Sequence, residues 1–287
     1  MENSIRIIQE KRKNPILLLD LKEIQKPILL EAHNLLCKKK FKVLDVILQT
    51  PGGDADASFL LMKLLRTKAE KVNIIVPLYA KSAGTLMCLG ADKILLTDLS
   101  ELGPLDTQIV EQQDGGGSKF SSALNGFKAL EQIQMHALET VDITTKLILS
   151  RNSMKIAEAI KLSIDFSSKT IGSLYSQFNP YKIGEYARVL EIGERYGIIL
   201  LTRYLKWNKE NAEKTVKTLV KRYPSHGFVL DLEELQQLNL PAEKIDNDLI
   251  ESILHIRKEL LETSISSMKL FELSGGEESD SIIENEI

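Results

Sequence analysis

Two short segments of the chain contain groups that can act together on a carbonyl carbon. Ser82 lies in the sequence YAKSAGT, between an apolar run and a series of small residues. A serine hydroxyl at such a turn can attack the carbon, and the backbone N–H of Ala83 can stabilise the oxyanion that forms. Gly53, with Gly52 as the alternative, can supply a second N–H at the start of a helix. Alone, Ser82 is more typical of a helix N-cap. The two glycines fit a simple tight turn equally well.

A nucleophilic serine needs a base, and one of the four histidines lies in a suitable context. His226 occurs in the turn-like sequence YPSHGFV, whereas the other three lie in helical patterns. A neutral imidazole oriented by a carboxylate can accept the serine proton near neutral pH. Two carboxylates are candidates to orient it: Asp106, after a Gly-Pro pair, and Asp231, five positions after His226. Asp106 and His226 also fit purely local turn roles.

A lysine amine is the alternative base, provided that it is desolvated. Lys119 and Lys128 are the candidates by sequence, although Lys119 borders a run of glycines and is expected to be solvated. We interpret Lys81, next to Ser82, as a contact for a substrate carboxylate or as solvated surface.

No motif in the chain predicts a cofactor or a metal. The segment GGGSK at 115–119 lacks the residue order of a phosphate-binding loop, and no GxGxxG fingerprint occurs. Asp54 and Asp56 fit ordinary roles in the first turn of a helix. The two cysteines, Cys37 and Cys88, are far apart, and we expect buried free thiols.

The elements that must position these residues alternate between strand and helix patterns. Apolar runs predict buried strands at 16–19, 43–48, 72–76 and 93–96, and helical spacing follows at 21–39, 57–65 and 82–89. This alternation predicts an α/β fold with a mostly parallel sheet. Right-handed crossovers bring the carboxyl ends of parallel strands to one edge, so we expect the turns at Gly52 and Ser82 to lie side by side.

The rest of the chain reads as mainly helical. Periodic apolar residues predict helices over 127–161, 184–205, 210–223 and 247–262. We expect four parts: an α/β core at 1–110, a flexible glycine-rich loop at 111–119, a helical part at 120–273 that completes the domain and makes oligomer contacts, and an acidic disordered tail at 274–287.

Composition argues against several protein classes. Lysine and arginine number 37 against 40 aspartates and glutamates, a net charge of −3 that gives no general attraction for nucleic acid. The first residues are charged and lack the apolar core of a signal peptide, and no apolar run is long enough to span a membrane. We therefore expect a cytoplasmic protein.

Four segments, taken in order and spacing, resemble the serine dehydrogenase proteinase family, which is related to the Clp proteases and to signal peptide peptidase A. They are LQTPGGD at 48–54, AKSAGTL at 80–86, ELGPLDTQI at 101–109 and YPSHGFV at 223–229. The resemblance implies the ClpP/crotonase fold of repeated βαβ units, whose helices often mediate homo-oligomer assembly.

The resemblance also implies roles for individual residues, in the chain order Ser, Asp, His. Ser82 would be the nucleophile, Asp106 the orienting acid and His226 the base, with the Gly53 and Ala83 amides stabilising the oxyanion. Signal peptide peptidases use a lysine base, so Lys119 and Lys128 stay open as alternatives.

The expected activity is hydrolysis of peptide bonds in peptides or proteins through an acyl-enzyme on Ser82, without a cofactor. One alternative is a crotonase-type acyl-CoA enzyme, which shares the fold and the paired amides but needs no nucleophilic serine. The other is a non-catalytic assembly scaffold whose helical half recruits a partner. Reaction of Ser82 with a fluorophosphonate probe would favour hydrolysis over both.

Overall fold

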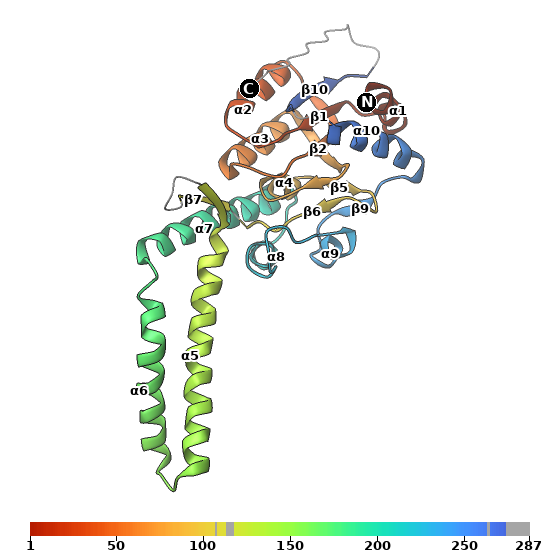
Figure 1. The fold of residues 1–287 in the computed structure, drawn as a ribbon. Coiled ribbons are helices and arrows are strands. Elements are labelled where there is room, and N and C mark those ends of the chain that lie inside the picture. The colour runs from red at the N-terminus through yellow and green to blue at the C-terminus, as the bar shows by residue number, and fades with distance from the viewer. Residues whose placement is uncertain (107, 113–117, 263–264, 274–287) are drawn as a thin grey trace. The chain divides into compact units, whose positions relative to one another are not determined.

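The computed structural model describes residues 1–106, 108–112, 118–262 and 265–273. It divides into two compact units (Figure 1). We call Met1–Asp106 together with Ile192–Ile287 the sheet unit, and Thr107–Glu191 the hairpin unit. Residues 113–117 and 274–287, which contain much of the predicted loop and all of the predicted tail, lie outside the described residues.

The sheet unit is built on a six-stranded sheet with the strand order β10-β1-β2-β3-β5-β9. Neighbouring strands are parallel except β10, which pairs antiparallel with β1 so that Ile16 faces Phe271. The strands are β1 (Ile16–Asp20), β2 (Phe41–Gln49), β3 (Ala69–Val76), β5 (Lys93–Leu96), β9 (Ala242–Lys244) and β10 (Ser267–Phe271). The predicted α/β class with a mostly parallel sheet is confirmed.

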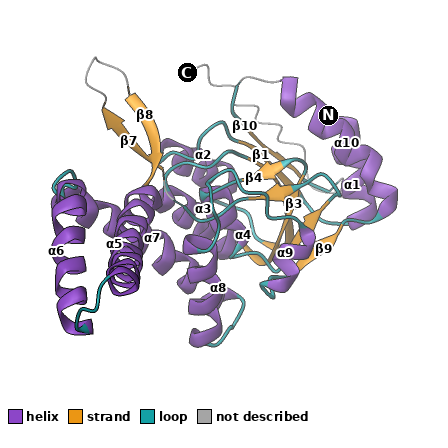
Figure 2. Cartoon of the chain, turned by 60° about the horizontal axis from the view of Figure 1, so that its bottom comes forward, coloured by secondary structure: helices purple, strands orange, loops and turns teal. Residues whose placement is uncertain are grey.

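Helices cover both faces of this sheet (Figures 1 and 2). On one face, Ile16 and Leu18 of β1 join a buried cluster with residues of α1 (Glu2–Arg12) and α10 (Ile250–Glu262). Side chains alternate along a strand, so Leu17 points to the opposite face, where α2 (Pro27–Leu36) and α3 (Ala55–Lys68) lie. Each such leucine is fully buried, which stabilises the fold by roughly 1.5–3 kcal/mol.

The helix predicted over 21–39 is shorter than expected, because the chain before α2 makes backbone hydrogen bonds to another segment. Ile24 pairs with the turn that follows β2, donating its N–H to the Gly52 carbonyl at 2.8 Å and accepting from the Asp54 N–H at 2.8 Å. The helix then begins at Pro27, whose missing N–H is tolerated in a first turn.

Short elements complete the sheet unit. β4 (Tyr79–Ala80) pairs in parallel with β6 (Glu101–Leu102), and α4 (Ala83–Cys88) follows β4 directly. The remaining elements are α8 (Lys209–Lys221), α9 (Leu232–Gln237), the 3₁₀ helix η1 (Asn247–Leu249) and the last part of α7 (Pro180–Tyr204).

The hairpin unit contains a pair of strands, β7 (Gln108–Gln112) and β8 (Ser118–Ser122). It also contains two long helices, α5 (Ala123–Arg151) and α6 (Ile156–Tyr175), and the first part of α7. The prediction of one helix over 127–161 is wrong. Asn152 and Lys155 have extended backbone angles, so the chain leaves α5 and starts a second helix. Asparagine and serine at this break favour caps and turns over helix interiors.

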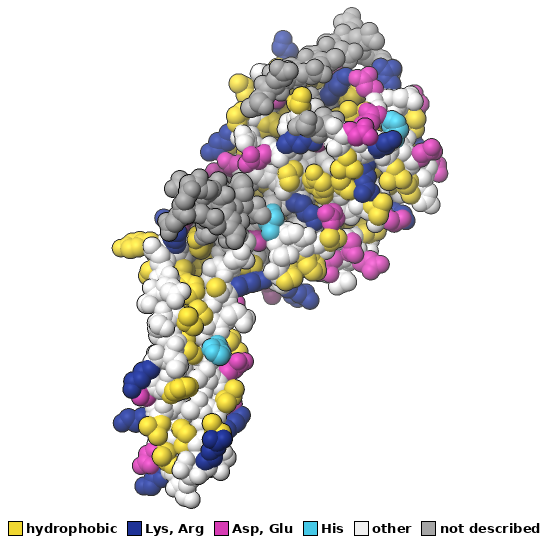
Figure 3. Space-filling model, in the orientation of Figure 1, with side chains coloured by type: hydrophobic (Ala, Val, Ile, Leu, Met, Phe, Trp, Pro, Cys, Tyr) yellow, Lys and Arg dark blue, Asp and Glu magenta, His cyan; other side chains and the backbone are white. Residues whose placement is uncertain are grey.

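The two helices of this unit touch along a narrow strip. α6 is buried only at every fourth residue, namely Ala159, Ser163, Ser167 and Ile171. Large apolar side chains on either side of the strip stay exposed, including Ile156 (65%), Ile164 (53%) and, on α5, Ile143 (64%). Figure 3 shows hydrophobic side chains along the arm that α5 and α6 form.

Candidate active site

Ser82 lies at a strained bend between β4 and α4. Its backbone angles are φ 49° and ψ −110°, a conformation that costs a non-glycine residue about 1–3 kcal/mol and persists where neighbouring contacts enforce it. Two hydrogen bonds fix the bend: the Lys81 N–H donates to the Thr50 carbonyl at 3.0 Å, and the Gly84 N–H donates to the Lys81 carbonyl at 2.7 Å. Ser82 occupies the N-cap position, but its hydroxyl makes no capping hydrogen bond within the described residues.

The glycine turn after β2 lies directly beside this bend. Gly52 and Gly53 have φ values of 127° and 140°, which L side chains rarely adopt. A Cβ on Gly52 would lie 3.0 Å from the Ser82 Cβ and 3.5 Å from the Ala83 nitrogen. A Cβ on Gly53 would lie 2.4 Å from the Ile24 carbonyl oxygen. Gly52 therefore lets this turn approach the Ser82 bend, and Gly53 lets it approach the backbone of Ile24.

The backbone N–H groups at these turns differ in their hydrogen bonding. The Gly52 N–H donates to the Thr50 hydroxyl at 3.2 Å. Among the residues that the structure describes, no acceptor is paired with the N–H of Gly53 or of Ala83. These two donors are therefore free to bind an anionic oxygen, whereas Gly52 is already engaged.

Asp106 and His226 meet although they are far apart in sequence. The His226 Nδ1 lies 2.8 Å from the backbone carbonyl oxygen of Asp106 and 4.0 Å from its Oδ2. A carbonyl oxygen only accepts, so Nδ1 must carry the proton, which leaves Nε2 as the acceptor in the neutral ring. The Asp106 side chain is buried, and the Leu105 N–H donates to the Leu219 carbonyl at 3.0 Å, which anchors this segment.

The segment that carries His226 is held from both sides. The Phe228 N–H donates to the Ser225 carbonyl at 3.1 Å, and the rings of Tyr223 and Phe228 pack with centroids 5.0 Å apart. Burial and a hydrogen bond to Glu234 raise the pKa of Tyr223, so its hydroxyl stays neutral. Leu230 then pairs with Leu102 of β6, which joins this segment to the one that leads to Asp106.

The other candidates lie in different surroundings. Asp231 is exposed and caps α9, accepting from the Glu234 N–H at 2.9 Å. Lys119 and Lys128 belong to the hairpin unit: Lys119 pairs with Glu111 in the β7–β8 ladder, and Lys128 is a half-buried residue of α5.

The acids beside the glycine turn have structural partners, which matches the first-turn roles expected for them. Asp54 caps α3 by accepting from the Ala57 N–H at 3.0 Å, and Asp56 accepts from the Tyr196 hydroxyl at 2.8 Å. Within the described residues, no group of three or more His, Cys, Asp or Glu side chains could hold a metal ion. Cys37 is exposed rather than buried as expected, and Cys88 is buried.

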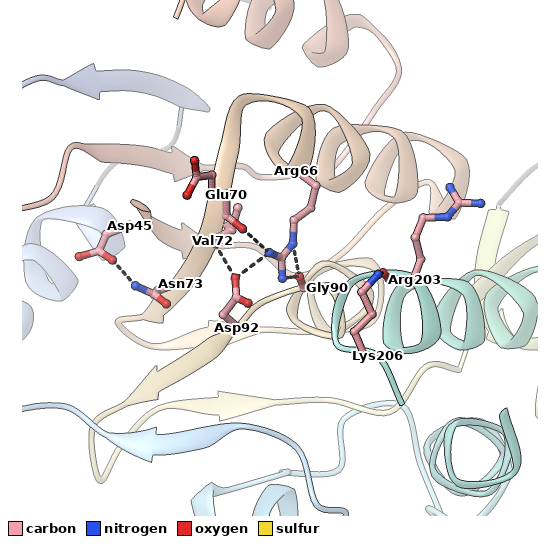
Figure 4. Close-up of polar contacts among 9 residues, drawn as sticks. All are labelled: Asp45, Arg66, Glu70, Val72, Asn73, Gly90, Asp92, Arg203 and Lys206. Carbon is pink, nitrogen blue, oxygen red and sulfur yellow. Dashed lines mark hydrogen bonds and ion pairs between the residues drawn. The ribbon is translucent and has the colours of Figure 1, made fainter. Parts of the chain in front are cut away.

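Two basic residues, one at each end of α4, have structural roles that the sequence does not indicate. Lys81 is not solvated: its side chain is 13% exposed, and its ammonium lies 3.0 Å from the Glu101 carboxylate. Arg66 of α3 fixes the opposite end of α4, because its Nε donates to the Gly90 carbonyl at 2.7 Å and its Nη1 to Asp92 at 2.6 Å (Figure 4). The carboxylate partner of either cation could not be inferred from local sequence, since it lies at least 20 residues away.

A family model matches part of the chain. Residues 29–165 match the model of the ClpP-like SDH-type serine proteinases. This part of the chain is similar to that family. The match confirms the resemblance over the motifs at 48–54, 80–86 and 101–109 and supports a serine-type peptidase. It spans Gly53, Ser82, Asp106 and both candidate lysines, whereas His226 lies beyond it.

Two curated relatives come from Methanocaldococcus jannaschii, and both are uncharacterized proteins. MJ0137 is 43% identical over 70 residues, which is 24% of this chain and 24% of that protein. MJ1495 is 35% identical over 106 residues, or 37% of this chain and 34% of that protein. The chain thus matches about a quarter to a third of the length of each relative.

Two solved structures, both of mutant proteins, are similar at low identity. A ClpP1 mutant from Listeria monocytogenes is 13% identical with a TM-score of 0.40, covering 85% of this chain and 99% of that one. A mutant of the 1510-N membrane-bound stomatin-specific protease is 15% identical with a TM-score of 0.41, covering 80% of this chain and 79% of that one. At such scores, neither similarity indicates an activity for this chain. No helix among the described residues is long and apolar enough to cross a membrane.

Proposed function

We propose that the chain is a serine peptidase that cleaves peptide bonds through an acyl-enzyme on Ser82. The observation that carries this proposal is the bend at Ser82, where a strained backbone, a hydroxyl without a capping role and two free N–H groups occur together. Backbone strain of this kind is retained at functional sites because the surrounding contacts enforce it. An ordinary helix N-cap would also leave the Ala83 N–H unpaired, but it would not require the strained backbone of Ser82.

In the proposed mechanism, the Ser82 hydroxyl attacks the carbonyl carbon of the scissile peptide bond while His226 Nε2 takes the hydroxyl proton. The carbonyl oxygen becomes an oxyanion and binds the N–H groups of Gly53 and Ala83. His226 then gives the proton to the leaving amine, the peptide C–N bond breaks, and the acyl-enzyme remains. A water molecule, deprotonated by the same imidazole, hydrolyses the ester and regenerates Ser82.

Asp106 acts in this proposal through two atoms. Its backbone carbonyl accepts the Nδ1–H at 2.8 Å, which selects the tautomer in which Nε2 can accept a proton. Its carboxylate, 4.0 Å from Nδ1, stabilises the imidazolium that forms during the reaction. The carbonyl does not depend on the side chain, so the tautomer survives a change of the carboxylate.

The hairpin unit suggests that the active form is a homo-oligomer. The apolar side chains beside the α5–α6 strip cannot be covered by two helices alone, and burying them against another copy would gain roughly 25 cal/mol per Å². We propose that α5 and α6 mediate this self-association, and that the substrate is a peptide or an unfolded protein segment.

The test of the function is hydrolysis of a fluorogenic peptide library by four forms of the protein: the unaltered chain, Ser82→Ala, His226→Ala and Asp106→Asn. We expect kcat/KM to fall by at least about 10³-fold for Ser82→Ala and for His226→Ala. Asp106→Asn should lose only about 10-fold to 10²-fold, because the backbone carbonyl still holds Nδ1–H.

Each other outcome has a definite meaning. Cleavage by Ser82→Ala at the rate of the unaltered chain, with both proteins folded, contradicts the peptidase proposal. Full activity of His226→Ala together with an inactive Ser82→Ala removes His226 as the base. The lysine alternative then predicts that Lys119→Ala or Lys128→Ala is inactive.

A further inference from the structure

Lys81, which the proposed mechanism does not use, joins three parts of the candidate site. Its backbone belongs to the bend at Ser82, where its N–H donates to the Thr50 carbonyl at 3.0 Å. Its side chain leaves the bend, and its Nζ lies 3.0 Å from both the Glu101 carboxylate and the Leu102 carbonyl oxygen. A third acceptor, the Phe228 carbonyl oxygen, is 3.4 Å away.

These acceptors use the full capacity of the ammonium. A lysine ammonium carries three N–H donors and no acceptor, and three oxygen atoms lie within hydrogen-bond distance of this one. Donation of all three protons requires the charged form. Lys81 is therefore unsuited to act as the base, although it is adjacent to Ser82.

The two carbonyl groups that Lys81 contacts belong to the segments of the other site residues. Leu102 precedes Asp106 by four positions and Phe228 follows His226 by two. The chain makes room for the lysine stem at Gly103, where a Cβ would lie 2.7 Å from the Lys81 Cδ.

A backbone contact between the same two segments shows what the ammonium adds. Leu102 and Leu230 exchange hydrogen bonds of 2.9 Å and 3.1 Å. The Leu102 oxygen therefore accepts from both the Leu230 N–H and Lys81. The Leu102–Leu230 hydrogen bonds connect the two segments at Leu230. Lys81 adds a second connection at Phe228, which is closer to His226 in the chain.

We propose that Lys81 is a positioning residue that holds the Asp106 and His226 segments in place beside Ser82. This inference deepens the proposed peptidase function and rests on it for its effect on catalysis. Removal of the ammonium would leave two carbonyls and one carboxylate without a charged donor, so the His226 segment would move more freely. A displacement of about 1 Å at a reacting group can lower a rate roughly 10²-fold.

The experiment compares Lys81→Met with the matched control Lys93→Met. Methionine keeps an unbranched stem of similar length and removes only the ammonium. Lys93 also pairs with a glutamate, Glu243 at 2.8 Å, but on an exposed part of β5. The first measurement is hydrogen exchange of the backbone amides at 101–106 and 223–231, together with the free energy of unfolding. The second is kcat and KM for a cleaved fluorogenic peptide, with Lys81→Arg as the conservative variant.

We expect faster exchange in both segments for Lys81→Met, a kcat about 10-fold to 10²-fold lower, and an almost unchanged KM. Lys81→Arg should restore slow exchange and part of kcat, because it keeps the charge but not the geometry of the ammonium. Lys93→Met should change none of these quantities.

The two proposals fail in different ways. Exchange in Lys81→Met that equals the exchange in the unaltered chain overturns the role of Lys81, whatever the activity. If Lys81→Met exchanges faster but the unaltered chain shows no Ser82-dependent cleavage, the positioning contact is supported and the peptidase function is overturned. A loss of kcat accompanied by faster exchange throughout the sheet unit shows general destabilisation, and this too overturns the positioning role.

Discussion

The sheet unit and the hairpin unit bury their apolar side chains to very different degrees. In the sheet unit, Leu17 of β1 and Ile47 of β2 are fully buried between layers of helices. In the hairpin unit, α6 has isoleucines and a phenylalanine that are about half exposed, such as Ile164 at 53% and Phe166 at 51%. The first unit has a complete core of its own, whereas the second presents apolar surface that a binding partner would cover.

Because of this difference, mutations in the two units should have different effects. Where the interior is close-packed, even one added carbon atom must displace its neighbours. On an exposed apolar face, a polar substitution removes little packing and instead changes association. We therefore expect mutations in the sheet unit to change folding stability and catalysis. Mutations on the exposed apolar face of the hairpin unit should change self-association.

The largest effect on folding is expected at the glycine turn. Gly53→Ala would place a Cβ 2.4 Å from the Ile24 carbonyl oxygen at a φ of 140°, whereas Gly52→Ala would meet the Ser82 Cβ at 3.0 Å. Gly53→Ala should lower the free energy of unfolding by at least about 3 kcal/mol, and Gly52→Ala by about 1–3 kcal/mol. Chemical denaturation measures both values. Equal stability of Gly53→Ala and the unaltered chain would show that the turn is not packed as described.

A smaller effect, on association alone, is expected in the hairpin unit. Ile164→Asp places a charge on the exposed apolar side of α6 and should weaken self-association about 10-fold to 10²-fold, with unfolding changed by less than about 1 kcal/mol. Ser168→Asp is the matched control, since Ser168 is an exposed polar residue of the same helix. Analytical ultracentrifugation over a range of concentrations measures the association. An unaffected association constant for Ile164→Asp would exclude this surface as the interface.

The smallest effect, on the pH dependence of stability, is expected at a buried carboxyl group of the sheet unit. Asp20, at the end of β1, is almost fully buried, and this burial raises the pKa of its carboxyl group despite the nearby Lys22 ammonium. The folded state therefore binds the Asp20 proton more tightly than the unfolded chain does. The resulting stabilisation is complete below the unfolded pKa, near 3.9, and is lost as the pH rises through the folded value.

Asp20→Asn should consequently raise the free energy of unfolding at pH 7 and leave it nearly unchanged at pH 3, where the aspartate is protonated in both states. Lys22→Gln serves as the control, because it removes the favourable partner and should lower stability at pH 7. A lower stability of Asp20→Asn at pH 7 would mean that the charged carboxylate is favoured in the fold.

Local periodicity was sufficient to predict the parallel strands of the sheet unit. The runs at 16–19, 43–48, 72–76 and 93–96 correspond to β1, β2, β3 and β5, because strands buried on both faces are continuously apolar. The same argument predicted that Gly52 and Ser82 meet, since parallel crossovers bring such turns to one edge.

Elements whose stability depends on distant partners could not be predicted. β10 has the mixed sequence SMKLF, and its pairing with β1 joins residues about 250 positions apart. The break between α5 and α6 was missed because the apolar spacing continues on both sides of it. Lys81 was misinterpreted because its partners at Leu102 and Phe228 come from other segments, which only the folded chain brings together.

The proposed function requires the Ser82 hydroxyl to be a nucleophile at a strained bend. It is tested most directly by treating the native protein with a fluorophosphonate and locating the adduct by mass spectrometry of its peptides. We expect one adduct, on Ser82, that forms much more slowly in His226→Ala and is absent in Ser82→Ala. An unmodified Ser82 after complete exposure to the probe, or equal labelling of the Ser82→Ala protein, would contradict it.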